Sequence, residues 1–320
     1  MADPIPSGTR DVLPEELREL RALTERMRAV FERAGYGEVR TPAFEYERTF
    51  ERDGGPPGGS YRLFDEHGNV LVLRSDMTIP IARLVGNRYA AAEPPLRFCY
   101  FADSYRGVRP QRGQAREVMQ AGIELIGAGG APGTAEAVTV LCDCVEAAGL
   151  RSFRVGVGDV TLYPSLLEAL GVAEPERALI LAELAAGDFV GVEREILGLG
   201  IAPAEVQLLL RVARTRGGAE TLDGLHGPLE QAGAGMREFL ALLEPRVAER
   251  VLFDFGLVRS LGYYTGAIFQ VFDPAHRLPL GSGGRYDELL AGFGRALPAV
   301  GFALDVERVH VALAAQEQLA

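Results

Sequence analysis

The chain has 320 residues, of which 48% are hydrophobic and 24% charged, and this balance is typical of a globular protein with a substantial core. Its formal net charge of −11 argues against a nucleic-acid-binding protein, because such proteins concentrate basic residues on one surface. No apolar run approaches the roughly 20 residues that span a bilayer, and the N-terminus lacks the basic and apolar regions of a secretion signal. We therefore expect a cytoplasmic protein that does not contact a membrane.

The cysteines and histidines give no sign of a disulfide framework or a metal site. Cys99, Cys142 and Cys144 contain no Cys-x-x-Cys pair, and the last two point to different faces of a predicted helix. The four histidines show no metal-ligand spacing, and the chain has no Walker loop, Gly-x-Ser-x-Gly elbow or His-Glu-x-x-His motif. We expect reduced structural cysteines, no metal and no bound cofactor.

The first predicted element is an amphipathic helix from Pro14 to Ala34. Proline suits the first turn of a helix, and Gly35 suits its C-terminal end. One apolar stripe at helical spacing runs along it, made of Leu17, Leu20, Leu23, Met27, Val30 and Phe31. This stripe predicts that one face of the helix packs on the core.

Strands follow the first helix. Residues 54–60 are too rich in glycine and proline for a packed element, whereas the apolar runs at 70–74 and 96–101 indicate strands. A third strand covers residues 118–126, and its period of two predicts two different faces. One face would carry Met119, Ala121, Ile123 and Leu125, and the other Gln120, Gly122 and Glu124.

The second half of the chain alternates between helical and strand-like segments. Thr134 is a suitable cap for a helix that runs to residue 148, and residues 162–250 are predicted to be helical almost throughout. Strands return at 251–255 and 267–272, and a last helix begins near Asp305. These elements predict a single α+β domain over residues 1–320, an antiparallel sheet flanked by helices, with a helical insertion at about residues 165–250.

Polar residues cluster at strand ends in several segments. Arg74, Asp76 and Thr78 follow one strand and precede an apolar helix start, where Thr78 alone would be explained as a helix cap. The arginine-rich segment 104–116 suits either a solvated turn or an anion clamp, because guanidinium groups bind phosphates and carboxylates bidentately.

Two further segments and one strand face allow a ligand as well as a structural role. Gln120 and Glu124 lie either on a solvated sheet face or beside a bound α-amino group. Residues 257–266 carry paired tyrosines that suit either a core or a pocket, and the glycines of 281–284 let a ligand approach the backbone. The pattern predicts a large sheet whose polar face binds a small charged molecule.

Taken in order, these segments resemble histidyl-tRNA synthetase, a class II aminoacyl-tRNA synthetase, from residue 6 to the end of the sequence. The most specific pieces are Leu-Val-Arg-x-Leu-x-Tyr-Tyr-Thr-Gly at 257–266, Gly-Gly-Arg-Tyr-Asp at 283–287 and Pro-Ala-Val-Gly-Phe at 298–302. The resemblance implies a class II synthetase fold. It also implies a histidine-binding set made of Asp76, Thr78, Gln120, Glu124, Arg259, Tyr263 and Tyr264, and an ATP site that includes Arg106 and Arg308.

Departures from the synthetase pattern indicate a non-catalytic relative. Val108 replaces the glutamate of motif 2, Gly262 replaces an aspartate of the histidine signature, and Asp76 replaces a longer glutamate. The sequence also contains no equivalent of the C-terminal anticodon-binding domain of about one hundred residues. This combination resembles the regulatory subunit of ATP phosphoribosyltransferase, so we expect no catalytic residue, a vestigial ATP site and no tRNA partner.

That resemblance implies specific partners. The short-form catalytic subunit of ATP phosphoribosyltransferase would be one, in a hetero-oligomer that performs the first step of histidine biosynthesis and responds to free histidine. A second copy of the chain would be another, since class II domains pair around their first motif. Two alternatives stay open: a truncated synthetase that forms histidyl-adenylate, and a stand-alone histidine sensor.

Overall fold

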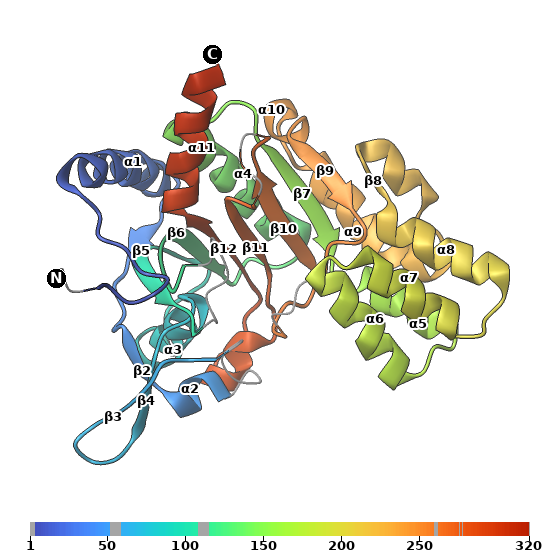
Figure 1. Ribbon diagram of the computed structural model, residues 1–320, viewed down its shortest axis with the longest axis horizontal. Coiled ribbons are helices and arrows are strands. Elements are labelled where there is room, and N and C mark those ends of the chain that lie inside the picture. Colours follow the sequence, from blue (N-terminus) through green and yellow to red (C-terminus); the bar gives the residue numbers. More distant parts are fainter. Residues whose placement is uncertain are drawn as a thin grey trace.

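The computed structural model describes residues 4–51, 59–107, 115–258, 262–274, 276 and 278–319. Within these residues a nine-stranded sheet forms the centre of the molecule, in the order β1-β5-β6-β12-β11-β10-β7-β9-β8 (Figure 1). The strands, in that order, are Gly37–Glu38, Leu96–Tyr105, Glu117–Ile126, Ala299–Asp305, Gly281–Arg285, Ala267–Phe272, Arg154–Asp159, Val251–Asp254 and Arg216–Gly217.

The sheet is mainly antiparallel, as the sequence predicted. Every pair from β5 to β7 is antiparallel, and parallel pairs join only β1 to β5 and β7 to β9 among the described strands. Strand β8 was not predicted: it lies in the helical segment and pairs with β9 through Arg216 and Gly217. The class II synthetase-like fold class is confirmed.

Three helices cover one face of the sheet: α1 (Pro14–Arg33), α4 (Gly130–Ala148) and α11 (Val306–Leu319) (Figure 1). The predicted stripe of α1 is buried except at Leu17, which stays 37% exposed. Its side chains pack in one cluster with Ala121, Ile123 and Leu125 of β6, which confirms the inward face of that strand. The predicted cap Thr134 was wrong, because α4 begins one turn earlier at Gly130.

Shorter elements cover part of the opposite face. They are a three-stranded sheet of β2 (Phe44–Tyr46), β4 (Val70–Leu73) and β3 (Arg62–Phe64), with α2 (Glu47–Glu51), α3 (Thr78–Arg88) and the 3₁₀ helix η3 (Leu289–Phe293). Arg74 connects the two sheets, because its guanidinium donates to the carbonyls of Thr41 and Asp103, both at 2.8 Å. The turn after β4 is thereby fixed against β5.

The segment between β7 and β9 is mostly helical and extends to one side of the sheet (Figure 1). It occupies the position of the predicted insertion and contains α5 (Leu162–Ala169), α6 (Glu174–Ala186), α7 (Phe189–Gly198), α8 (Pro203–Arg214), η1 (Ala219–Gly224), η2 (Gly227–Leu229), α9 (Glu230–Ala241) and α10 (Pro245–Ala248). No helix in the described part of the chain has the length and apolarity required to span a bilayer.

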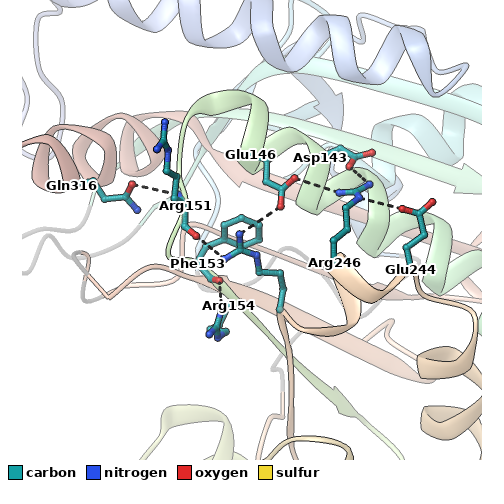
Figure 2. A network of polar contacts seen from close by, with 9 residues as sticks. Asp143, Glu146, Arg151, Phe153, Arg154, Glu244, Arg246 and Gln316 are labelled. Atoms are coloured by element: carbon teal, nitrogen blue, oxygen red, sulfur yellow. Dashed lines mark hydrogen bonds and ion pairs between the residues drawn. The ribbon is translucent and has the colours of Figure 1, made fainter. Parts of the chain in front are cut away.

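A network of polar contacts attaches α10 to the end of α4 (Figure 2). Arg246 pairs with Asp143 at 2.7 Å and with Glu146 at 3.3 Å. Next to it, Arg250 donates to the Arg151 carbonyl at 2.6 Å and lies 4.6 Å from the centre of the Phe153 ring.

Burial decides which contact of α10 stabilises the fold more. The Arg246 side chain is 44% exposed, so solvent screens its ion pairs, whereas Val247 beside it is fully buried. We expect Val247→Ala to lower the free energy of unfolding by about 2 kcal/mol, because it removes buried methyl groups and leaves a cavity. Arg246→Met, which keeps the aliphatic stem, should cost no more than about 1 kcal/mol. Urea unfolding measures both, and a larger loss for Arg246→Met would make the ion pairs the principal attachment.

Candidate functional site

Glu124 lies at the centre of the polar face of the sheet. It is on β6, between Phe98 of β5 and Gly301 of β12, and is only 1% exposed. Its carboxylate accepts hydrogen bonds from the Thr78 hydroxyl at 2.8 Å and from the Tyr286 hydroxyl. A Cβ atom at position 301 would overlap this carboxylate, so the glycine of the 298–302 motif makes room for it.

Burial changes the protonation of this carboxyl group. Removal from water raises the pKa of Glu124 to about 8, although the two hydrogen bonds to its carboxylate act in the opposite direction. The nearby carboxylate of Asp76 raises this pKa further, since two negative charges repel. Near neutral pH, Glu124 can therefore either accept or release a proton in response to a ligand.

Asp76 and Thr78 lie in the turn that begins α3. Asp76 accepts a hydrogen bond from the Ile79 amide at 3.1 Å and so caps the helix. Thr78, the cap expected from the sequence alone, instead points its hydroxyl at Glu124. Burial raises the pKa of Asp76, while the guanidinium of Arg106 lowers it. The structure therefore brings Asp76, Thr78 and Arg106 close to Glu124.

Four tyrosines surround this group of polar side chains. The rings of Tyr263 and Tyr264 lie 4.9 Å apart, and those of Tyr263 and Tyr286 lie 5.8 Å apart, in edge-on arrangements. Tyr100 is buried on the same sheet face, where a Cβ atom at Gly122 would approach its hydroxyl oxygen to 2.5 Å.

Tyr100 and Tyr286 were not predicted as site residues. Tyr286 belongs to the Gly-Gly-Arg-Tyr-Asp motif, but the motif does not indicate that its hydroxyl bonds Glu124. Tyr100 pairs with Gly122 in the β5–β6 ladder, so the strand alternation that places Glu124 could also have identified it.

Gln120 lies on the same face of β6 as Glu124, with Gly122 between them. In the sheet it is paired with Ala102 of β5 and Asp305 of β12. It is 8% exposed, and its Oε1 atom has no hydrogen-bond partner among the described residues. A buried acceptor without a donor costs about 1–3 kcal/mol. A bound N–H group would remove this cost, so Gln120 is suited to contact a ligand.

The two predicted ATP residues differ in their surroundings. Arg106 lies near Asp76. Arg308 lies in the first turn of α11, and its guanidinium pairs with Asp305 at 2.9 Å and donates to the Pro279 carbonyl at 2.9 Å. A triphosphate would have to compete with that carboxylate for Arg308. The predicted residue Arg259 and the departure Val108 lie outside the described residues.

The side chains around Glu124 have a chemistry that suits the binding of a small polar molecule. The polar groups there are two carboxyl groups, an amide oxygen, the Thr78 hydroxyl, phenolic hydroxyls and the nearby Arg106 guanidinium. The acceptors among them suit a small molecule with an ammonium group and a second N–H donor. Among the described residues no group of histidine, cysteine, aspartate and glutamate side chains is arranged to hold a metal ion. The three cysteines are buried, and burial raises the pKa of the Cys99 thiol to about 12, so it stays protonated.

The chain is similar to known proteins over nearly its whole length. The model of the histidyl-tRNA synthetase family matches residues 8–309. ATP phosphoribosyltransferase regulatory subunits of Symbiobacterium thermophilum and Desulforamulus reducens are 41% and 39% identical to it, over 98% and 96% of this chain and 80% and 78% of theirs.

Solved structures agree with this relationship. An ATP phosphoribosyltransferase regulatory subunit/histidyl-tRNA synthetase from Bacillus halodurans has a TM-score of 0.89 at 32% identity, over 97% of this chain and 83% of that one. Histidyl-tRNA synthetase from Nostoc has a TM-score of 0.83 at 20% identity, over all of this chain and 77% of that one, which establishes the shared fold alone. The chain therefore belongs to the histidyl-tRNA synthetase family and, within it, to the ATP phosphoribosyltransferase regulatory subunits.

Proposed function

We propose that this protein is the non-catalytic regulatory subunit of an ATP phosphoribosyltransferase and that free histidine binds in the pocket around Glu124. The observation that carries the proposal is a wholly buried carboxylate among tyrosine rings, beside an amide oxygen without a donor. In the assembled enzyme, histidine bound in this pocket would inhibit the first step of histidine biosynthesis.

The two ends of histidine fit different parts of the pocket. Glu124 is the deepest polar group and is surrounded by Tyr100, Tyr263 and Tyr286, so it suits the flat imidazole ring and one of its N–H groups. Gln120 and the half-buried Asp76 present an amide oxygen and a carboxylate, which suit the α-ammonium group. Arg259, which the sequence resemblance includes in the histidine-binding set, has a guanidinium group that suits the α-carboxylate.

Loss of the ionisable carboxyl group of Glu124 should abolish histidine binding. At a histidine concentration 100 times the dissociation constant, the free energy of unfolding of wild-type protein should increase by about 2.7 kcal/mol, and its Tm should rise accordingly. Glu124→Gln has the same shape but cannot act as an anionic acceptor, so its thermal shift should disappear. The matched control is Glu238→Gln on the exposed surface of α9. A full shift in Glu124→Gln would mean that histidine binds elsewhere.

Glu124 should also make the stability of the free protein depend on pH. Its pKa in the fold is about 8, against 4.5 ordinarily, so the folded state holds the proton more tightly than the unfolded chain does. This contribution is complete below about pH 4.5 and is lost as the pH rises through about 8. The wild-type Tm should fall between about pH 5 and pH 8 more steeply than that of Glu124→Gln. Parallel curves for the two proteins would contradict the raised pKa.

The partner test uses the assembled enzyme. Wild-type protein should form a complex with a short-form catalytic subunit, and histidine should inhibit the complex. If histidine acts by changing substrate affinity, substrates must change histidine affinity by the same factor, typically about 5- to 150-fold. A complex with Glu124→Gln should assemble and stay active but lose most of its inhibition. Full sensitivity in that complex would place the feedback site outside this pocket.

The outer face of the three-stranded sheet supports a second proposed partner, another copy of the chain. Tyr46, Leu71 and Leu63 lie opposite one another in neighbouring strands and so share one face, to which Phe44 also belongs. Phe44 is 51% exposed and Tyr46 and Leu63 are each 40% exposed, which is unusual for adjacent large apolar side chains on a monomer. Sedimentation equilibrium measures the dimer, and a monomer at all concentrations would refute it.

A truncated histidine-activating synthetase is the alternative that one observation favours, since Arg106 lies near the pocket carboxylate Asp76. The ion pair between Arg308 and Asp305 weighs against it, because it occupies the second predicted ATP-binding arginine. Histidine-dependent pyrophosphate exchange would support this alternative. A stand-alone sensor would bind histidine without forming the complex.

A further inference from the structure

Two connected cavities lie along the N-terminal segment, away from the histidine pocket. Their volumes are about 490 Å³ and 270 Å³, and Arg10, Ala115 and Glu307 line both. The larger cavity is lined by Met119, which points to the α1 side of β6, whereas Gln120 next to it points to the pocket side. The two cavities share lining residues and lie side by side beside α1 and α11, and together we call them the N-terminal groove.

The floor of the N-terminal groove is apolar and reaches the surface. Leu20 and Met119 lie in the larger cavity together with Leu17, the one member of the α1 stripe that stays exposed. Val311 of α11 lines the smaller cavity and is 53% exposed. Exposed aliphatic side chains at both ends indicate a groove that accepts a segment longer than one small molecule.

The walls of the N-terminal groove carry an excess of negative charge. Asp103, Glu117 and Glu307 line the larger cavity. Arg10, the arginine among the described residues that line it, is paired with Glu16 at 2.7 Å and with Glu307 at 3.1 Å. In the described part of the chain, Asp103 and Glu117 form no ion pair with any arginine or lysine.

The smaller cavity does not reverse this balance. Arg308 there is paired with Asp305. The ring of His276 is engaged with the carbonyl of Leu278 at 2.8 Å. The groove as a whole therefore combines an aliphatic floor with acidic walls whose arginines are already neutralised.

We propose that the N-terminal groove docks a segment of the catalytic subunit that carries lysine or arginine among aliphatic residues. The alkyl stem of such a side chain would lie over Leu17 and Met119, and its cationic head would lie near Asp103 and Glu117. Complementary charge of this kind orients a partner and speeds its association. The inference rests on the proposed function, since it assigns a contact surface to the same complex.

The test measures the affinity of full-length protein for the catalytic subunit at two salt concentrations. Glu117 is exposed, so Glu117→Arg can reverse one wall charge without disturbing the core. It should weaken the complex by about tenfold or more and reduce the dependence of affinity on salt. Leu17→Asp, which makes the floor polar, should weaken it to a similar extent. The matched control Glu238→Arg makes the same charge change on α9 and should stay within about twofold of wild type.

The histidine-induced thermal shift checks that each variant is folded, because the pocket lies on the other side of β6. If both groove variants keep this shift and bind the catalytic subunit as tightly as wild type, the docking proposal is wrong while the proposed function stands. The docking proposal is also wrong if the variants alter only self-association, which would assign the groove to a second copy. If wild-type protein forms no complex at all, both proposals fail.

Discussion

The arrangement of the pocket depends on placing one carboxylate, that of Glu124, inside a sheet. A buried carboxylate without partners would cost several kcal/mol, so its neighbours must supply hydrogen bonds or it must stay protonated. Both responses occur here: Thr78 and Tyr286 donate to it, and its pKa rises to about 8. The neighbouring strand must also leave room, which explains why position 301 is a glycine.

The alternation of side chains along β6 gives the strand one apolar face and one polar face. Ala121, Ile123 and Leu125 pack against the long helices and belong to the main core. Gln120, next to Ala121, and Glu124, between Ile123 and Leu125, face the opposite side of the sheet. A slip of one residue in the register would exchange these two sets, placing a carboxylate in the core and aliphatic side chains in the pocket. The long ladder that β6 forms with β5 and β12 prevents such a slip.

Features governed by local periodicity could be predicted from the sequence. The first helix and the two faces of β6 follow from spacings of 3.6 and 2 residues, and the structure places both as expected. Contacts between distant segments could not be predicted in this way, because Tyr286 and Glu124 are 162 residues apart. Strand β8 was missed for a similar reason, since two residues have no detectable period and Arg216 becomes a strand residue only through its partner.

Two local features were missed for a different reason. The pair Asp305 and Arg308 has the i,i+3 spacing that joins opposite charges in the first turn of a helix, so the sequence did contain that signal. The resemblance to a nucleotide-binding family implies a role for the arginine alone and none for Asp305. Likewise, Thr78 precedes Pro80 and suits a cap, but a carboxylate two residues earlier competes for the same amide groups. The Thr78 hydroxyl therefore donates to Glu124 and not to the helix.

A continuous set of contacts leads from the pocket to the distant helical segment. Tyr286, which bonds Glu124, is followed by Asp287, and Asp287 accepts from Arg285 at 2.6 Å. The same arginine donates to the Gly130 carbonyl at the first residue of α4. The other end of α4 carries the carboxylates that pair with α10 (Figure 2).

If α4 moved as a rigid unit, a displacement at Gly130 would also displace Asp143 and Glu146. The ion pairs there are half exposed and weak, and they can exchange partners at low cost, unlike the packed Val247 beside them. A ligand that altered the hydrogen bond between Tyr286 and Glu124 would act at one end of this set of contacts, and the exposed ion pairs of α4 lie at the other end. Helix α4 can couple histidine binding to the contacts of α10 only if histidine binds more tightly when the helix is in one position than in another.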